Sequence, residues 1–422
     1  MELALLLGTF LVLLFLGVPV AVSMLLSSIV SILSSGLPLT IVAERLLSGV
    51  NSFTLLAVPF FILAAVIMNR GGLTRRLLGV ARCFVGHFHG GTAQVDVLAS
   101  IFFAGMSGSA TADAASQGKI LIPHMQKEGY DLSFAAGITA ASSTIGAIIP
   151  PSIAMIIYGS VTNISVGQLF LAGIVPGLAV GGALMIAVNV MSRRRGYPRS
   201  TRMSWRDSWP LIWRALPALL APVIILGGII TGATTPTEAG VIACVYSFFV
   251  SGFIYRELKP RDFMPLLAES VETAAVPMFI IAAAASFGFV LTASGFGFVV
   301  QSLAQGITEN PTVFLVLVIL LFLFVGLFVE ATAAMLIFVP ILMPLVGLYS
   351  LNPIQFAMIV IITLLLGTIT PPVGLQLYIV ASIARISPFE VTVWPFVLVI
   401  LVVVIAMVFF PGLATYLPSL LL

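Results

Sequence analysis

Two carboxylates, Asp113 and Glu330, stand inside long apolar stretches of this chain. A charge within a bilayer is costly, about 2.5–3.5 kcal/mol for Asp on insertion scales, so each carboxylate needs a cation, a hydrogen-bond donor or a water-filled cavity. Glu330 has no Lys or Arg within fifty residues on either side. Both carboxylates are therefore predicted to face a substrate or a cation. The alternative is a capping role, which the first turn of a helix also favours for Asp113.

Two stretches of the chain repeat each other at a constant offset of 221 positions, and both contain residues that interrupt a membrane helix. The matching strings are 105–123 with 326–344, and 146–151 with 367–372. Glycines and paired prolines in corresponding apolar segments of two halves are the best sequence pointer to a transporter's binding site. Interrupted backbone is tolerated in a bilayer only where it lines a cavity or is buried in protein, so these segments are predicted to do so.

The interruptions also predict which atoms bind ions. Ser109 is expected to cap the helix that follows it, and a helix N-terminus with free N–H groups attracts anions. The helix that ends before each interruption presents carbonyl oxygens, which suit Na⁺. Prolines free further carbonyls because they lack an N–H donor, and Ser152 and Thr370 add hydroxyl oxygens. Two symmetry-related cation sites, one per half, are expected beside a central substrate cleft.

The composition places these residues in a membrane. The chain is 60% hydrophobic and 8% charged, whereas soluble proteins average about 25% charged residues. This excludes a soluble globular protein and indicates an all-α polytopic membrane protein. The basic residues lie in loops at membrane ends, so no nucleic acid is expected, and the run at 193–195 is expected to contact membrane lipid. Cys83 and Cys244 form no CxxC, so neither a disulfide nor a metal site is predicted.

Apolar runs and interruptions predict an inverted-repeat ion-transporter fold with about ten transmembrane helices plus two re-entrant helical hairpins. The first repeat, 1–191, is expected to hold scaffold helices within 1–69, a connector at 70–86, a re-entrant hairpin at 93–125, a broken span at 132–159 and a span at 166–190. A cytoplasmic basic linker follows at 192–209. The second repeat, 210–422, is expected to hold scaffold helices at 210–254, a span at 273–293, a re-entrant hairpin at 313–346, a broken span at 352–380 and a last span at 391–415.

The distribution of charge predicts the topology. An odd number of spans per half inverts the second repeat relative to the first. With the N-terminus outside, the connectors at 70–86, 119–131, 192–214, 255–262 and 385 share one face and hold all eighteen Lys and Arg residues except Arg45. The positive-inside rule makes this face cytoplasmic and both termini periplasmic. The two hairpins then open to opposite faces, which predicts alternating access.

Four strings of the sequence resemble the large membrane subunit of the tripartite ATP-independent periplasmic (TRAP) transporters of bacteria and archaea. They are MSGSATAD at 106–113, IGAIIPPS at 145–152, TPTEAG at 235–240 and ITPPVG at 369–374. The resemblance covers essentially the whole chain. It implies a Na⁺-driven importer of organic acids or related solutes in the cytoplasmic (inner) membrane, working by an elevator mechanism. It also implies a periplasmic substrate-binding protein and a small four-helix membrane subunit, which is expected as a separate chain because no further helices precede residue 1.

The same resemblance implies site residues. The two Na⁺ sites are expected to use Ser107 with the carbonyls of Gly146, Ile149 and Pro151, and Thr370 with the carbonyls of Gly326, Gly367 and Val373. The substrate is expected near Ser107, Ser109, Asp113, Glu330 and Thr332. The chain departs from the family at two places. The acid at 330 is usually Asp, and the arginine that follows the Phe-Gly motif of sialic-acid members is absent from 291–295, which disfavours sialic acid.

The sequence alone leaves other functions open. A stand-alone sodium/dicarboxylate symporter has similar architecture, and solute uptake without a binding protein would favour it. An intramembrane enzyme would use Asp113 and Glu330 as a catalytic pair, but the sequence contains no HExxH motif and no plausible Ser/His pairing. A channel is a further alternative, which accumulation of solute against its gradient would exclude.

The predicted topology has a direct test. Cysteines introduced at positions 200 and 310 are expected to react with a membrane-impermeant thiol reagent from opposite faces of the membrane. Labelling of both positions from one face would overturn the topology.

Overall fold

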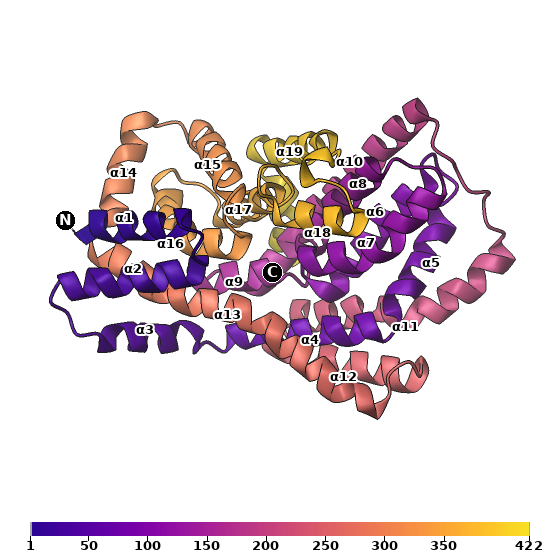
Figure 1. Cartoon of the computed structure of the whole chain (residues 1–422), viewed down its shortest axis with the longest axis horizontal. Coiled ribbons are helices and arrows are strands. Elements are labelled where there is room, and N and C mark those ends of the chain that lie inside the picture. The colour runs from indigo at the N-terminus through magenta and orange to yellow at the C-terminus, as the bar shows by residue number, and fades with distance from the viewer. Residues whose placement is uncertain (1, 422) are drawn as a thin grey trace.

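The computed structural model describes residues 2–421, which form helices joined by short turns and contain no β-strand (Figure 1). The first half comprises α1 (Glu2–Phe15), α2 (Val20–Ser34), α3 (Thr40–Val50), η1 (Thr54–Leu56), α4 (Ala57–Arg70), α5 (Leu73–Val85), α6 (Gly91–Ser107), α7 (Ala110–Lys127), α8 (Leu132–Ser143), η2 (Thr144–Ala147), α9 (Ile153–Thr162) and α10 (Val166–Arg195). The predicted all-α class is confirmed.

The second half begins after position 204. It comprises α11 (Trp205–Ile230), α12 (Pro236–Phe249), η3 (Val250–Ile254), η4 (Pro260–Asp262), α13 (Phe263–Ala293), α14 (Phe296–Ile307), α15 (Pro311–Gly326), α16 (Ala331–Leu348), α17 (Pro353–Gly367), α18 (Leu375–Ala384), η5 (Pro388–Glu390), α19 (Trp394–Phe409) and α20 (Gly412–Leu421). We call α6–α7 the first hairpin and α15–α16 the second hairpin. Residues 144–152, between α8 and α9, are the first break, and residues 368–374, between α17 and α18, are the second break.

Within residues 2–421, five helical stretches are individually long and apolar enough to cross a membrane: α10, α11, Pro236–Ile254, Pro260–Ala293 and α16. The α3–α4 and α19–α20 pairs pass the same test together but are bent by 64° and 62°. Other apolar helices have 10–17 residues, shorter than the roughly 20 that a straight span needs. The chain is thus multi-pass, and the count of ten spans stays a prediction.

Four predicted boundaries differ from the ends of the helices, and one helix was not foreseen. The connector at 70–86 contains α5, which buries Leu73 and Leu77 on one face and exposes Arg75 on the other. The span expected at 273–293 begins at 263, because its early glutamates lie on an exposed helical face. Helix α14, which precedes the second hairpin, was not foreseen.

The last two corrections concern helix ends. The span expected at 391–415 stops at Phe409, since Pro411 lacks the N–H donor that a continuing helix requires. The predicted linker 192–209 is helical at both ends, so only residues 196–204 are non-helical.

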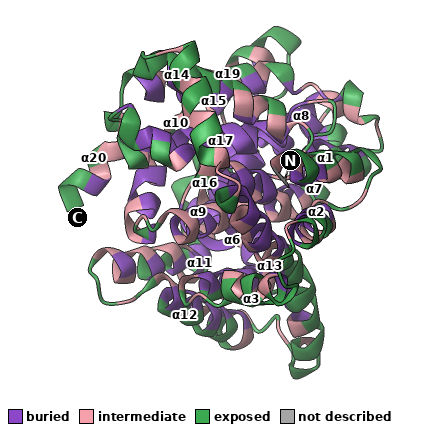
Figure 2. Cartoon of the chain, turned by 90° about the vertical axis from the view of Figure 1, so that its left-hand side faces the viewer, coloured by how far each residue is buried: buried purple, intermediate pink, exposed green. Residues whose placement is uncertain are grey.

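The helices form two groups that pack against each other. In the outer group, α13 runs beside α2, α3 and α4, and α12 packs on α4 (Figure 1). In the inner group, the first hairpin packs on α8 and α18, and the second hairpin packs on α17 and α9. Burial is greatest in the inner group (Figure 2), where every residue of α17 from Gln355 to Gly367 is buried. The first break is buried with this group except at Ile149, whereas the second break also contains two exposed residues, Pro372 and Val373.

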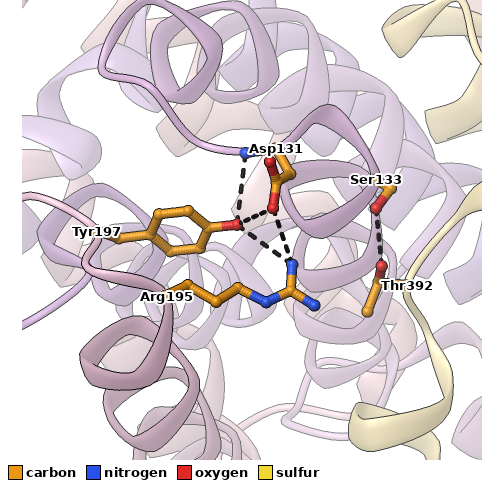
Figure 3. Close-up of polar contacts among 5 residues, drawn as sticks. All are labelled: Asp131, Ser133, Arg195, Tyr197 and Thr392. Atoms are coloured by element: carbon orange, nitrogen blue, oxygen red, sulfur yellow. Dashed lines mark hydrogen bonds and ion pairs between the residues drawn. The ribbon is translucent and has the colours of Figure 1, made fainter.

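The segment that joins the two halves is fastened to the first half (Figure 3). The Tyr197 hydroxyl donates to Asp131 Oδ2 at 2.6 Å, and Arg195 Nη1 donates to the same oxygen at 3.0 Å. Burial raises the pKa of Tyr197, so its hydroxyl keeps the proton that it donates. Nearby, the Ser133 and Thr392 hydroxyls lie 2.8 Å apart and join α8 to the segment before α19.

Removing this attachment is expected to lower stability. The Tyr197→Phe variant loses one hydrogen bond to a charged group, which contributes about 1.5–3 kcal/mol, so the purified protein in detergent should have a lower melting temperature. Tyr416→Phe, at a side chain that is 60% exposed, is the matched control and should leave the melting temperature unchanged. Equal melting temperatures for the two variants would contradict the attachment.

Candidate ion and solute site

A cavity of about 790 Å³ lies between the outer and inner groups. Pockets for small molecules have volumes of about 300–1,000 Å³, so this one has room for a small solute. Both hairpin tips contribute to its wall, through Ser107, Ser109, Glu330 and Thr332. The wall also includes five residues with charged side chains: Arg70, Arg75, Lys119, Glu257 and Glu269. The structure thus brings four of the five residues expected near the solute to one cavity.

The tip of the first hairpin lies against the first break. Gly108 has φ of 61°, a left-handed conformation, and a Cβ there would lie 2.6 Å from the Pro151 carbonyl oxygen. Only glycine fits both constraints. The Ile153 N–H donates to the Gly108 carbonyl at 3.2 Å. Ser109 accepts a hydrogen bond from the Ala112 N–H at 3.4 Å, which confirms the predicted N-cap of α7.

Asp113 points toward this break and not into the cavity. Its side chain is fully buried, and Oδ1 accepts a hydrogen bond from the Ser107 hydroxyl at 2.5 Å. Within residues 2–421, Oδ2 has no hydrogen-bond partner. A Cβ built on Gly146 would lie 1.9 Å from Oδ2, so this oxygen is packed against the Gly146 backbone. The cavity is lined instead by the opposite face of α7, which explains why Asp113, expected near the cleft, is shielded from it.

The paired prolines of the first break leave carbonyl groups without helical donors. A helix would bond the Gly146 and Ala147 carbonyls to the N–H groups of residues 150 and 151, and both are prolines. The Ser152 hydroxyl replaces one of these donors, at 2.6 Å from the Ala147 oxygen. No hydrogen bond formed by residues 2–421 reaches the Gly146 carbonyl. A carbonyl oxygen and a carboxylate oxygen without hydrogen-bond partners among residues 2–421 are therefore both buried at the first break.

At the second break, both carbonyls that lose a helical donor regain a backbone hydrogen bond. Its prolines remove the donors for the Gly367 and Thr368 carbonyls, but the Thr370 N–H bonds the first at 3.0 Å and the Gln376 N–H bonds the second at 3.1 Å. The Thr370 hydroxyl donates to the Leu366 carbonyl at 2.7 Å and keeps its own lone pairs free.

The second hairpin packs on this break backbone to backbone. A Cβ on Gly367 would lie 2.6 Å from the Gly326 Cα, and a Cβ on Gly326 would lie 3.0 Å from the Gly367 Cα. Gly326, Gly367 and Thr370, which were expected at one Na⁺ site, thus lie close together at the second break. Val373 follows three residues later, with a side chain that is 42% exposed.

Glu330 caps the returning helix of the second hairpin. Its Oε2 accepts from the Ala333 N–H at 3.2 Å, and its Oε1 accepts from the Thr332 hydroxyl at 2.9 Å. Both side chains also contribute to the cavity wall. The capping role is thus present in the structure, and it places a carboxylate at the cavity.

Comparison with known proteins decides the family. Residues 7–413 match the family model described as "Tripartite ATP-independent periplasmic transporter, DctM component". The chain belongs to the TRAP transporter large subunits.

Relatives of this TRAP subunit are permease proteins. It is 38% identical to the sialic acid TRAP transporter large permease protein SiaM of Vibrio cholerae, over 97% of each chain. It is 40% identical to the C4-dicarboxylate TRAP transporter large permease protein DctM of Pseudomonas aeruginosa, over 89% of each chain. These relatives are transport subunits, so the intramembrane-enzyme alternative is wrong.

Solved transporter structures share the fold. MtrF of Neisseria gonorrhoeae has a TM-score of 0.59 and covers 87% of this chain, with 83% of its own chain aligned. YdaH of Alcanivorax borkumensis has a TM-score of 0.58, with 89% and 86% covered. Both are 15% identical to the TRAP subunit, so the likeness concerns the fold alone.

The two breaks of the TRAP subunit are not equivalent. At the offset of 221 positions, Ser107 corresponds to Phe328 and Asp113 to Ala334, so the second hairpin lacks both polar groups. Thr370 corresponds to Ile149. The hydroxyl expected to bind the ion at the first break, Ser107, therefore comes from the hairpin, whereas the one expected at the second, Thr370, belongs to the break itself.

Two buried polar residues escaped the sequence analysis. Asp96 accepts hydrogen bonds from Thr139 at 2.5 Å and Ser142 at 3.2 Å, and Gln376 lines the cavity near both breaks. The signal was available in both cases, because a charged or amide side chain in an apolar membrane segment points to a specific partner.

The glycine contact at the second break can be tested by stability. Gly367→Ala is expected to cost about 1–3 kcal/mol, because the new methyl group meets backbone that cannot move aside. In Gly347→Ala, the control on α16, the methyl group meets no atom within 4 Å. Thermal unfolding in detergent should therefore separate the two variants, and a Gly367→Ala protein as stable as the control would refute the contact.

Proposed function

We propose that this TRAP large subunit imports a small organic acid together with Na⁺. The observation that carries the proposal is the pair of bare oxygens at the first break. The Asp113 Oδ2 atom and the Gly146 carbonyl oxygen have no hydrogen-bond partner among residues 2–421. Buried oxygens without donors are costly, and a desolvated cation compensates them.

The donor set fits an alkali cation. The first site would use the Ser107 hydroxyl and the carbonyls of Gly146, Ile149 and Pro151, with the Asp113 carboxylate supplying negative charge. The second would use Thr370 with the carbonyls of Gly326, Gly367 and Val373. All of these ligands are oxygens, which suit a hard cation such as Na⁺, whose own charge would balance Asp113.

The cavity wall supports an anionic solute. The N-terminus of α7 reaches the cavity through Ala110 and Ala112, and helix N-termini favour anions. The corresponding end of α16 is already capped by Glu330. Ser107, Ser109, Glu330 and Thr332 would then contact the solute, whereas Asp113 would serve the ion. The names of relatives are consistent with this class, since they specify sialic acid and C4-dicarboxylates for those proteins.

Transport would follow an elevator mechanism. The two hairpins and the two breaks would move as one unit against the outer group, as inverted repeats in the inner membrane. The charged part of the cavity wall comes from segments that the positive-inside rule places in the cytoplasm, which would make this conformation inward-facing. The tripartite family description supports two further partners, a small four-helix membrane subunit and a periplasmic substrate-binding protein that delivers the solute.

The deciding experiment is Na⁺-driven uptake into liposomes that contain the large and small subunits, with the binding protein supplied and a panel of small acids, polyols and zwitterions as solutes. Ser107→Ala and Thr370→Ala should each raise the Na⁺ concentration for half-maximal uptake about tenfold, equivalent to about 1.4 kcal/mol. Glu330→Ala should abolish uptake and leave folding intact. Ser302→Ala, at an exposed hydroxyl on α14, is the control.

The outcomes distinguish the alternatives. An unchanged half-saturation for Na⁺ in both hydroxyl variants would remove the proposed coordination. Uptake that continues without the binding protein would favour the stand-alone sodium/dicarboxylate symporter. Wild-type rates in Glu330→Ala would leave that residue with its capping role alone.

A further inference from the structure

One glutamine connects the two breaks. Gln376 stands at the start of α18, is 1% exposed and borders the cavity. Its Oε1 accepts a hydrogen bond from the Ser143 hydroxyl at 2.8 Å, and its Nε2 donates to the Thr368 hydroxyl at 2.8 Å. Its backbone N–H also donates to the Thr368 carbonyl. A single side chain thus joins residues 143 and 368, which belong to different halves of the chain.

The partners of Gln376 adjoin the backbone proposed to bind ions. Ser143 is the last residue of α8 and directly precedes η2, which contains Gly146. Thr368 directly follows Gly367, the last residue of α17. Two short hydrogen bonds therefore connect the residues that adjoin the two proposed ion sites.

The directions of these hydrogen bonds favour a carboxamide. Thr368 donates its own hydroxyl hydrogen to the Leu365 carbonyl at 2.6 Å, so toward Gln376 it acts as an acceptor. The Ser143 hydroxyl has one hydrogen and two acceptors within reach, the Gln376 Oε1 at 2.8 Å and the Ala140 carbonyl at 2.7 Å, so these two oxygens share it. A carboxamide has a donor at one end and an acceptor at the other, whereas a carboxylate offers acceptors only.

The connection is not a consequence of the repeat. At the offset of 221 positions, the residue that corresponds to Gln376 is Met155, which is buried and has no hydrogen to donate. The first half therefore has no counterpart of the bridge at this position. A single polar link of this kind in an apolar surrounding is expected to have a specific role.

On the basis of the Na⁺ coupling proposed above, we propose that Gln376 is a positioning residue that couples the two ion sites, so that binding at one break prepares the other. An ion at the first break would fix the backbone next to Ser143, and the bridge would fix Thr368 with it. The second ion then binds to backbone that is already ordered and loses less conformational entropy, which is positive cooperativity.

The test measures how uptake depends on Na⁺ concentration in the reconstituted system. The wild type is expected to have a Hill coefficient well above 1, and Gln376→Leu a coefficient close to 1. Gln376→Glu keeps the Ser143 hydrogen bond but loses the one to Thr368, so it should also lower the coefficient. Should Gln376→Leu not fold, Ser143→Ala tests the same bridge by removing one hydroxyl.

Gln355→Leu is the matched control. Gln355 is a buried glutamine on α17, the helix that leads into the second break. Its Nε2 donates to the Met407 carbonyl at 2.9 Å, away from both breaks. This variant loses a comparable buried hydrogen bond, so stability should fall while the Hill coefficient stays at the wild-type value.

Each result has one meaning. Wild-type cooperativity in folded Gln376→Leu overturns the coupling role and leaves Na⁺-driven uptake standing. An equal loss of cooperativity in Gln355→Leu also overturns it, because any weakened packing would then have the same effect. If uptake by the wild type does not depend on Na⁺, the proposed function and the coupling are both overturned.

Discussion

A buried peptide carbonyl needs a hydrogen-bond donor. Two consecutive prolines remove two such donors, because proline has no N–H. In this chain the loss occurs twice, each time four residues after a glycine. Neighbouring groups replace most of the missing donors: Ser152 bonds Ala147, Thr370 bonds Gly367 and Gln376 bonds Thr368. The oxygens that keep no donor, at Gly146 and Asp113, are those that the proposed cation would satisfy.

Much of the fold was predictable, because long apolar runs and Gly-Pro interruptions are strong signals. The two hairpins, the two breaks and the cap at Ser109 all follow from local sequence. The failures were also systematic. Helix α5 and the start of α13 carry charges on one exposed face, and a charged stretch between apolar runs was interpreted as a connector. Amphipathic periodicity, not charge alone, would have separated the two cases.

The site was less predictable than the fold. The local sequence predicts which residues lie at the hairpin tips. The direction of the Asp113 side chain, however, depends on how the first hairpin packs on the first break. Only the packed structure shows that one face of α7 borders the cavity while Asp113 lies on the other, against Gly146. The bridge from Ser143 through Gln376 to Thr368 joins residues 233 positions apart and could not be read from local sequence.

The asymmetry between the breaks has a consequence for their stability. The second break regains its backbone hydrogen bonds from Thr370 and Gln376, so its conformation is supported without an ion. The first break keeps two oxygens without donors, so its conformation costs more whenever no cation is present. Under the proposed coupling, the supported break would hold the other close to its ion-binding conformation. Two repeated segments whose polar groups have diverged would then differ from a simple duplication, because one would organise the other.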